Sequence, residues 1–343
     1  MNLLSNSVVN KYIGLPSDIY DSLQVAEGTE WVQSSNAFLS AIFNKLVYQK
    51  VNTFTFVNPF RKYYGAPIKY GEGIENIYVD KIMGQKFDRS KTDPFEKHEN
   101  RVLATYAKLN YEMQYAVTVE DKELRKAVLS EYGEAQLANT LTSRLSGSAD
   151  IDEYLATIIM LNNPDNFADG FETIDVSDET SASGVAHAIS KKIGEVYRDF
   201  KLPSIDNNKL HVMNASRPED ILIIIKSSLM NDLDYDYLAA TYNLSKAEIK
   251  ASILEVRSFM AVINTIDGTT ISSEETGDDL DFMIIDTRGL DLHDCLKSIA
   301  PIYNPRGMYT NTFHNVWAAM QFNSSMQARA YKIQRTAGES TGD

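Results

Sequence analysis

A strict alternation of hydrophobic and polar residues marks positions 109–119. Every second side chain is large and hydrophobic, and those between are polar or small. Because successive side chains of a β-strand point to opposite faces, this pattern predicts a strand that is buried on one face. The hydrophobic set is Leu109, Tyr111, Met113, Tyr115, Val117 and Val119.

A second strand is predicted over residues 74–83, and a charged stretch with Gly84 and Pro94 occupies 84–108 between the two strands. We expect the two strands to pair as a long β-hairpin. An isolated two-stranded hairpin is only marginally stable in water, and each Tyr, Met or Val that it buries contributes roughly 1.5–3 kcal/mol. The hairpin therefore needs a surface to lie on, within its own chain or on a neighbouring copy.

The residues that follow this hairpin have a helical pattern. Asp121 is placed to cap a helix that runs to Gly133, and leucines then recur at every fourth position in a second helix that ends at Gly147. A capping box at Asp150 opens a third helix. This helix stops before Pro164, because the residue before a proline disfavours helical geometry. The run of helices is suited to form a long backbone element.

The second half of the chain mixes helices and strands. Hydrophobic side chains from Val185 to Phe200 follow helical spacing, and the uninterrupted apolar run at 221–225 predicts a fully buried strand. Such a mixture around one core is typical of an α+β fold. The remaining predicted elements are helices at 34–48 and after Ser245, and strands at 53–57, 259–265 and 281–286.

Charge is distributed unevenly along the 343 residues, a length that allows about two domains. Residues 1–126 carry 16 Lys/Arg and 15 Asp/Glu, a net charge of +1, whereas residues 127–343 carry 17 and 32, a net charge of −15, and the two sum to −14. A strongly acidic body argues against tight wrapping of nucleic acid, because phosphate binding requires a basic surface. The near-neutral first third is able to lie against the acidic body of a neighbouring copy.

Cysteine content and the first residues of the chain indicate the compartment. Cys295 is the single cysteine, so no disulfide within the chain is possible, which suits a reducing cytosol. The first residues lack the basic and apolar regions of a secretory signal. No stretch approaches the ~18 apolar residues of a membrane span. We expect synthesis and use in cytoplasm, without contact with a membrane.

Two clusters of acidic residues raise the question of a metal site. Asp232, Asp234 and Asp236 have the spacing of the first ligands of a calcium loop. The sixth position is Tyr237 where glycine is required, and the twelfth is Asn243 rather than Glu. A strand end followed by a helix cap is the simpler interpretation. The second cluster is Asp278, Asp279 and Asp281, for which we expect a solvated turn before a strand.

A catalytic site is not predicted. His293, Asp294 and Cys295 are consecutive, and immediate neighbours in a helix do not face each other, so they form no ready-made nucleophile and base. The five histidines lack metal-ligand spacing, and no glycine-rich phosphate loop is present. We therefore expect a protein that is not an enzyme and that holds no cofactor or metal. A soluble enzyme that uses Cys295 or the aspartate clusters remains a minor alternative.

Three segments carry a resemblance to a known family, in a shared order from about residue 30 to 331. The chain resembles the major capsid proteins of small short-tailed phages that start DNA replication from a protein primer. The first segment is Asn58-Pro59-Phe60-Arg61-Lys62, followed by Ile68, Gly71, Ile74-Glu75, Ile77-Tyr78 and Asp80. The second is the helical run with Gly133, then Asp152-Glu153-Tyr154. The third is Asn304-Pro305-Arg306-Gly307-Met308-Tyr309, then Val316-Trp317.

The resemblance implies the tailed-phage major capsid fold, the Johnson or HK-type fold. Some family members carry an additional immunoglobulin-like domain, which we do not expect here, because the chain ends soon after Ile333. The implied parts are an N-terminal arm with a first helix at 1–50, an extended loop at 51–120, a peripheral domain with its spine helix at 121–170 and 300–335, an axial domain at 171–299 and a polar tail at 336–343.

The implied function is structural. The chain is expected to assemble with many copies of itself, as pentamers and hexamers, into an icosahedral or elongated head that encloses double-stranded DNA without reading its sequence. A scaffolding protein and a portal are implied partners, and the place is the virion after assembly in host cytoplasm. The alternative is a host-encoded, encapsulin-like nanocompartment shell of the same fold. Side chains proposed to contact other subunits are Tyr70, Tyr78, Tyr111, Met113 and Tyr115.

Overall fold

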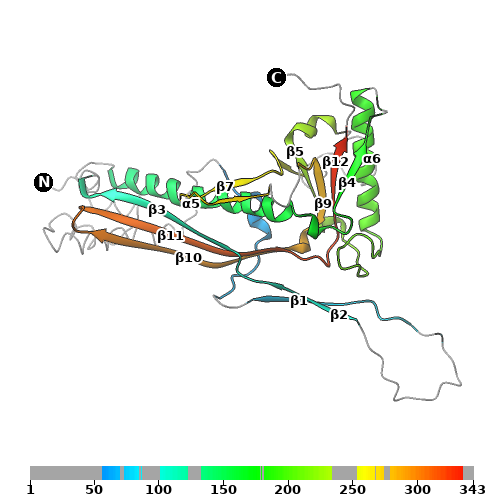
Figure 1. Ribbon diagram of the computed structural model, residues 1–343, viewed down its shortest axis with the longest axis horizontal. Coiled ribbons are helices and arrows are strands. Elements are labelled where there is room, and N and C mark those ends of the chain that lie inside the picture. The colour runs from blue at the N-terminus through cyan, green and yellow to red at the C-terminus, as the bar shows by residue number, and fades with distance from the viewer. Residues whose placement is uncertain are drawn as a thin grey trace, which may run out of the picture. The chain divides into compact units, whose positions relative to one another are not determined.

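The computed structural model divides into two compact units (Figure 1). One includes Leu109–Tyr154 and Asp294–Ala318, and the other includes Pro59–Lys108, Leu155–His293 and Ala319–Asp343. For 133–144, 182, 231 and 232 the backbone alone is described. The structure describes residues 56–69, 73–84, 86, 101–122, 133–177, 179, 181–233, 253–266, 268–273 and 279–334.

The second unit is built on a mixed five-stranded sheet in the order β4-β12-β9-β5-β6. The central strand β9 is antiparallel to both of its neighbours, whereas β12 pairs with β4 and β5 pairs with β6 in parallel. The strands are β4 (Phe171–Asp175), β5 (Ile221–Lys226), β6 (Ile253–Val256), β9 (Phe282–Asp286) and β12 (Ala328–Gln334). The predictions of a buried strand at 221–225 and of a strand at 281–286 are confirmed.

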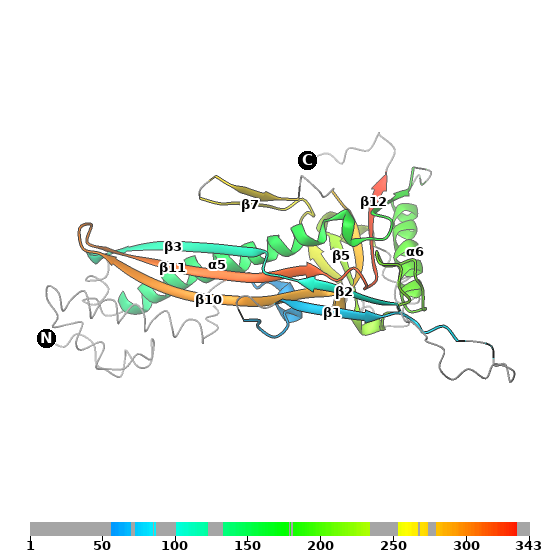
Figure 2. The same ribbon diagram turned by 60° about the horizontal axis from the view of Figure 1, so that its bottom comes forward.

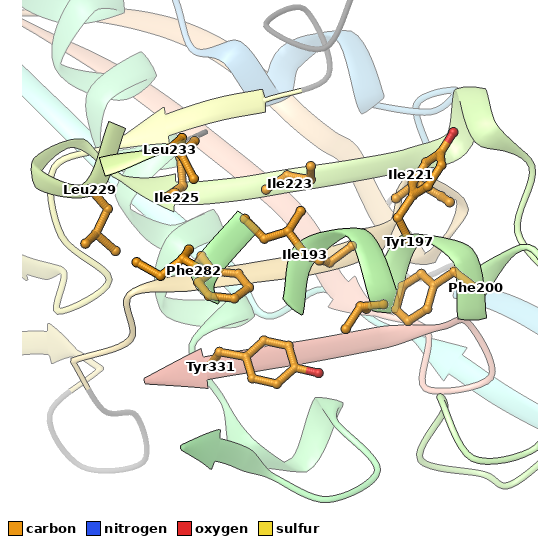
Figure 3. Packing of buried hydrophobic residues seen from close by; sticks show 13 residues of the cluster. Ile193, Tyr197, Phe200, Ile221, Ile223, Ile225, Leu229, Leu233, Phe282 and Tyr331 are labelled. Carbon is orange, nitrogen blue, oxygen red and sulfur yellow. The ribbon is translucent and has the colours of Figure 1, made fainter. Parts of the chain in front are cut away.

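Helix α6 (Ala182–Phe200) packs its apolar stripe against this sheet (Figure 3). The Oγ of Ser181 accepts a hydrogen bond from the amide of Gly184 at 3.0 Å and caps the helix. On the sheet side, the rings of Phe282 and Tyr331 stack with centroids 5.0 Å apart. The helix predicted from Val185 to Phe200 is therefore confirmed. Its apolar side chains form the helical side of the core, opposite those of the sheet.

A second sheet has the order β10-β11-β3 and consists of long strands. These are β3 (Tyr111–Glu120), β10 (Leu290–Asn304) and β11 (Tyr309–Phe322), of which β3 and β11 are antiparallel. The alternation along β3 is confirmed, since its hydrophobic positions are buried or half-buried and the polar ones are exposed. Cross-strand hydrogen bonds join the polar positions, Gln114 to Asn315 at 2.8 Å and Thr118 to Asn311 at 2.7 Å.

Helix α5 (Gly133–Leu161) is continuous over 29 residues, where the sequence predicted two helices (Figure 2). The predicted breaks at Gly147 and Asp150 are wrong, because both residues lie inside the helix. A glycine in a helix costs about 1 kcal/mol relative to alanine, and the burial of Leu145, Ala149 and Ala156 on the same helix offsets this cost. The predicted end before Pro164 is confirmed, with the short helix η2 (Pro164–Asn166) following.

The hairpin contains β1 (Ile74–Val79) and β2 (Val102–Ala107), paired from Ile74 opposite Ala107 to Val79 opposite Val102. The predicted pairing of 74–83 with 109–119 is wrong. The six residues of β2 lie within the stretch that the sequence analysis assigned to a charged connection. This nearer segment, and not the longer strand that follows it, pairs with β1. β3 pairs with β11 instead, across almost 200 residues of chain.

The remaining elements are short. β7 (Val262–Asn264) and β8 (Thr270–Ser272) form a small antiparallel hairpin, so the strand predicted at 259–265 is present but shorter. The 3₁₀ helices are η1 (Pro59–Tyr63), η3 (Pro218–Asp220), η4 (Ser227–Asp232) and η5 (Thr287–Gly289). Several predicted elements lie outside the described residues. They are the helices at 34–48 and after Ser245, the strand at 53–57 except its last two residues, and most of the helix after Asp121. Within the described part of the chain, no helix has the length and apolar character needed to cross a membrane.

Candidate functional site

The hairpin of β1 and β2 exposes an apolar face to solvent. Ile77, Val79, Val102 and Tyr106 are each 54–63% exposed, and they alternate along their strands with side chains that are half-buried. The register places Val79 opposite Val102, so these side chains are neighbours across the two strands. Beyond the last ladder pair, Ile82 and Met83 are exposed as well. An exposed apolar surface of this kind is typical of a site that binds another molecule.

The opposite face of the hairpin contacts its own chain. Tyr78 donates its phenol hydrogen bond to the main-chain oxygen of Met213, and the amide of Asn76 donates to the carboxylate of Asp291. Burial raises the pKa of Asp291 above its ordinary value, while the hydrogen bond from Asn76 opposes this shift. The surface that a two-stranded hairpin needs is therefore supplied on one face by the same chain.

Three of the five residues predicted to contact other subunits, Tyr78, Tyr111 and Tyr115, have hydrogen-bond partners within the chain. Tyr70 lies outside the described residues. Tyr78 points to Met213 rather than to the exposed face. Tyr111 is 6% exposed, and its hydroxyl lies 3.2 Å from that of Tyr115. Tyr115 in turn donates to Asp152 of α5 at 2.9 Å, and Met113 is half-buried on the same side of β3.

These findings change the role of the tyrosines. Tyr115, with Tyr111 beside it, joins β3 to α5 of its own chain, and contact with another subunit stays a prediction for Tyr111, Met113 and Tyr115. The aliphatic residues of the exposed face were not predicted individually. The alternation that places Ile77 and Val79 on one face is visible in the sequence. The prediction nevertheless selected mainly aromatic side chains, because of their residue type.

A polar cluster lies between α5, β3, β10 and β11. The ammonium group of Lys297 is 2.9 Å from the carboxylate of Glu153, which is fully buried, and 3.5 Å from that of Asp294. Burial, together with the positive charge of Lys297, lowers the pKa of His314 from 6.5 to about 4. Burial raises the pKa of both Tyr111 and Tyr115 well above the ordinary value. The ion pair of Lys297 with Glu153 and the hydrogen bond from Tyr115 to Asp152 join α5 to the strands, so the cluster serves as a structural element.

The acidic clusters have structural partners where the structure describes them. Asp279 accepts hydrogen bonds from the ammonium group of Lys226 at 2.8 Å, and Asp281 accepts one from the amide of Ile333 at 2.6 Å. The strand expected after this cluster begins at Phe282, whereas Asp278 lies outside the described residues, so the expected solvated turn stays a prediction. Asp234 and Asp236 lie outside the described residues. No group of three or more metal-ligating side chains occurs among the residues that the structure describes.

His293, Asp294 and Cys295 lie on strand β10, not on a helix as assumed. Alternate residues of a strand share a face, so His293 and Cys295 lie on one side of β10 and Asp294 on the other. The ring of His293 is 2.9 Å from the main-chain oxygen of Ala66, and Asp294 pairs with Lys297. The contacts that His293 and Asp294 make here, with a main-chain oxygen and a lysine, are thus structural.

Comparison with known sequences identifies relatives over most of the chain. The sequence profile of the Phi29-like phage major capsid proteins matches residues 18–332. The major capsid protein of Bacillus phage PZA is 26% identical over 301 residues, which cover 86% of this chain and 63% of the relative. That of Streptococcus phage Cp-1 is 24% identical over 299 residues, covering 83% and 80%. The chain thus spans less than two thirds of the Bacillus phage proteins that it matches.

Solved structures show the fold independently of sequence identity. A chain of the Staphylococcus phage Andhra capsid superimposes with a TM-score of 0.59 at 11% identity, covering 83% of this chain and 88% of that one. A chain of the mature capsid of bacteriophage PhiM1 gives 0.53 at 10% identity, covering 83% and 90%. The α+β architecture is that of tailed-phage capsid proteins. By its sequence profile and its fold, the chain belongs to the family of Phi29-like phage major capsid proteins.

Proposed function

We propose that this chain is the structural subunit of a phage head, which assembles with many copies of itself into a shell around double-stranded DNA. The family match and the names of the relatives support this role. The observation that carries it is the hairpin of β1 and β2, which is attached by one face and presents the other, apolar face to solvent.

The free energy gained by covering the exposed face favours a contact that is repeated between many subunits. Covering the side chains of Ile77, Val79 and Val102 contributes up to roughly 1.5–3 kcal/mol each, which is too little for a stable one-to-one complex once the cost of association is included. In a closed shell the same contact repeats around every subunit. Each subunit is then held by several neighbours at once, so modest contacts add up to a stable assembly.

The strand pairing favours a shorter extended loop than residues 51–120. β3 pairs with β11, so the loop proper is the segment around β1 and β2, at about 59–108. We assign α5 as the spine helix. The five-stranded sheet with α6 belongs to the axial domain, extended by β12. The arm at 1–50, the peripheral domain and the tail at 336–343 keep their proposed places.

The proposed partners follow from this role. They are further copies in pentamers and hexamers, a scaffolding protein and a portal. The packaged DNA faces a chain with a net charge of −14 and is held without sequence-specific contacts. The protein works in the virion after assembly in host cytoplasm, and its role is structural rather than catalytic.

Substitution on the exposed face tests the function. Ile77→Thr combined with Val79→Thr keeps β-branched side chains, and so the strand, but removes apolar area. We expect normal folding by circular dichroism and the absence of shells in electron micrographs, with and without a co-expressed scaffolding protein. The matched control is Ile266→Thr, a fully exposed position after β7. Intact shells from the double variant at the wild-type concentration would contradict the proposed function of this face.

A further inference from the structure

We propose that the loop 203–216 is a preformed seat that sets the direction of the hairpin before subunits meet, with Tyr78 and Asp80 as its positioning residues. This inference rests on the proposed function, since a preset direction is useful only if the hairpin contacts another subunit. The seat and the hairpin belong to the same compact unit.

The hairpin holds the seat through main-chain groups. The phenol of Tyr78 donates to the carbonyl oxygen of Met213, and a carboxylate oxygen of Asp80 accepts from the amide of the same residue at 3.4 Å. Arg101 donates to the carbonyl oxygen of Leu210 at 3.2 Å and lies 3.6 Å from the Asp80 carboxylate. Both polar main-chain groups of Met213 thus bind side chains of β1 and the residue that follows it.

These contacts are placed where they control direction. Asp80 and Arg101 close the ladder of β1 and β2, with the amide of Asp80 donating to the carbonyl of Arg101 at 3.0 Å. The stretch 81–100 begins immediately beyond them. A second attachment, Asn76 to Asp291 of β10, lies nearer the other end of β1. Two attachments along one strand fix the direction of its axis, whereas a single attachment would leave the strand able to rotate about it.

The seat is held in shape by its own hydrogen bonds. The buried side chain of Asn208 donates to the carbonyl of Val212 at 2.7 Å and accepts from its amide at 2.9 Å. His211, between them, has a φ of 48°, a left-handed conformation that costs free energy in a residue other than glycine. Ser204 and Asn214 exchange two main-chain hydrogen bonds of 3.0 Å. The loop therefore presents Leu210 and Met213 in a defined position.

The seat is also tied to the five-stranded sheet. The amide of Leu210 donates to the carbonyl of Ser324 at 3.3 Å, and that of Ala328, the first residue of β12, donates to the carbonyl of Asn207 at 2.9 Å. The side chain of Asn214 donates to the carbonyl of Ser325 at 2.9 Å. The seat thus transmits the position of the core to the hairpin.

The alternation of a strand makes the seat relevant to assembly. Tyr78 and Asp80 face the seat, so their neighbours Ile77 and Val79 face away from it. Holding one face presents the other at a fixed angle. Preorganisation of this kind lowers the conformational entropy that is lost when a partner binds. Each link is a hydrogen bond of modest net strength, so its loss affects the direction of the hairpin more than the stability of the core.

Removal of single links tests the inference. Tyr78→Phe deletes one hydroxyl group, and Asp80→Ala deletes the carboxylate. The matched control is Tyr309→Phe at the start of β11, outside the hairpin, whose hydroxyl accepts from the side-chain amide of Asn304 at 2.8 Å. We expect unchanged melting temperatures, but a concentration for shell formation that rises about three- to tenfold for Tyr78→Phe and Asp80→Ala. Asp80→Asn keeps an acceptor for Met213 and should recover most of the loss.

Hydrogen exchange of the unassembled subunit gives a readout that does not depend on shells. The amide of Met213 should exchange faster in Asp80→Ala than in the wild type, and at the wild-type rate in Tyr309→Phe. Equal exchange rates and equal assembly concentrations in all variants would overturn the role of the seat. Faster exchange with a wild type that never forms shells would leave the seat intact and refute the proposed function instead.

Discussion

Glu153 is a fully buried carboxylate whose charge is balanced by Lys297, 2.9 Å away on strand β10. Such a pair adds little net stability, because both ions lose their hydration. Removal of one partner is different, since it leaves a charge in a poorly solvated place. The pair therefore fixes the position of α5 against the sheet more than it strengthens the fold.

The pair predicts an asymmetric response to substitution. Lys297→Met should lower the free energy of unfolding by about 3–5 kcal/mol, because Glu153 then lacks its counter-charge. The double variant with Glu153→Gln should recover at least half of this loss. Denaturant unfolding of the three proteins measures the coupling. A double variant as unstable as Lys297→Met alone would show that the ion pair is not the cause.

His314 predicts a loss of stability on acidification. Burial lowers its folded pKa from 6.5 to about 4, so between these values the unfolded chain binds a proton that the folded chain does not. The free energy of unfolding should therefore fall as the pH decreases from 6.5 toward 4, by up to about 3 kcal/mol from this residue. The comparison of wild type with His314→Gln at pH 7 and pH 4.5 isolates the effect. Equal losses in both proteins would refute it.

At the scale of elements, local pattern predicted what forms, and the long-range partners were missed. The alternation of β3 and the apolar run of β5 are strong local signals, and both strands are present. Their partners are far away in sequence, because β11 lies almost 200 residues after β3. Gly147 misled the helix prediction, since a local cost of about 1 kcal/mol was offset by tertiary packing that the sequence does not display.

The packing of α6 on the sheet predicts a large effect of one core residue. Ile223 of β5 is 1% exposed within the cluster that includes Ile193 and Phe282. Ile223→Ala should lower the free energy of unfolding by about 2–5 kcal/mol, through lost burial and the cavity that remains. The control is Ile205→Ala at an exposed loop position, which should change it by less than about 0.5 kcal/mol. Similar effects of the two in denaturant unfolding would argue against this core.

At the scale of the whole molecule, the sequence predicted the fold through its resemblance to a family, and not through periodicity alone. The proposed contact surface was predicted on the hairpin and on the strand at 109–119, and contact of its residues with other subunits stays a prediction. Tyr78 and Tyr115 were chosen for their type, and the structure turns both phenols toward their own chain. Which face of a strand is left open depends on what the other face contacts. That information lies in the loop 203–216, distant in sequence.

The central claim is that the face formed by Ile77, Val79, Val102 and Tyr106 is covered by a neighbouring subunit. Electron cryomicroscopy of particles formed by the full chain tests it most directly. The account predicts closed shells in which these four side chains are buried against the next copy, while Tyr78 stays on Met213. Shells in which the four side chains remain in solvent, or a purified protein that stays monomeric under all assembly conditions, would contradict it.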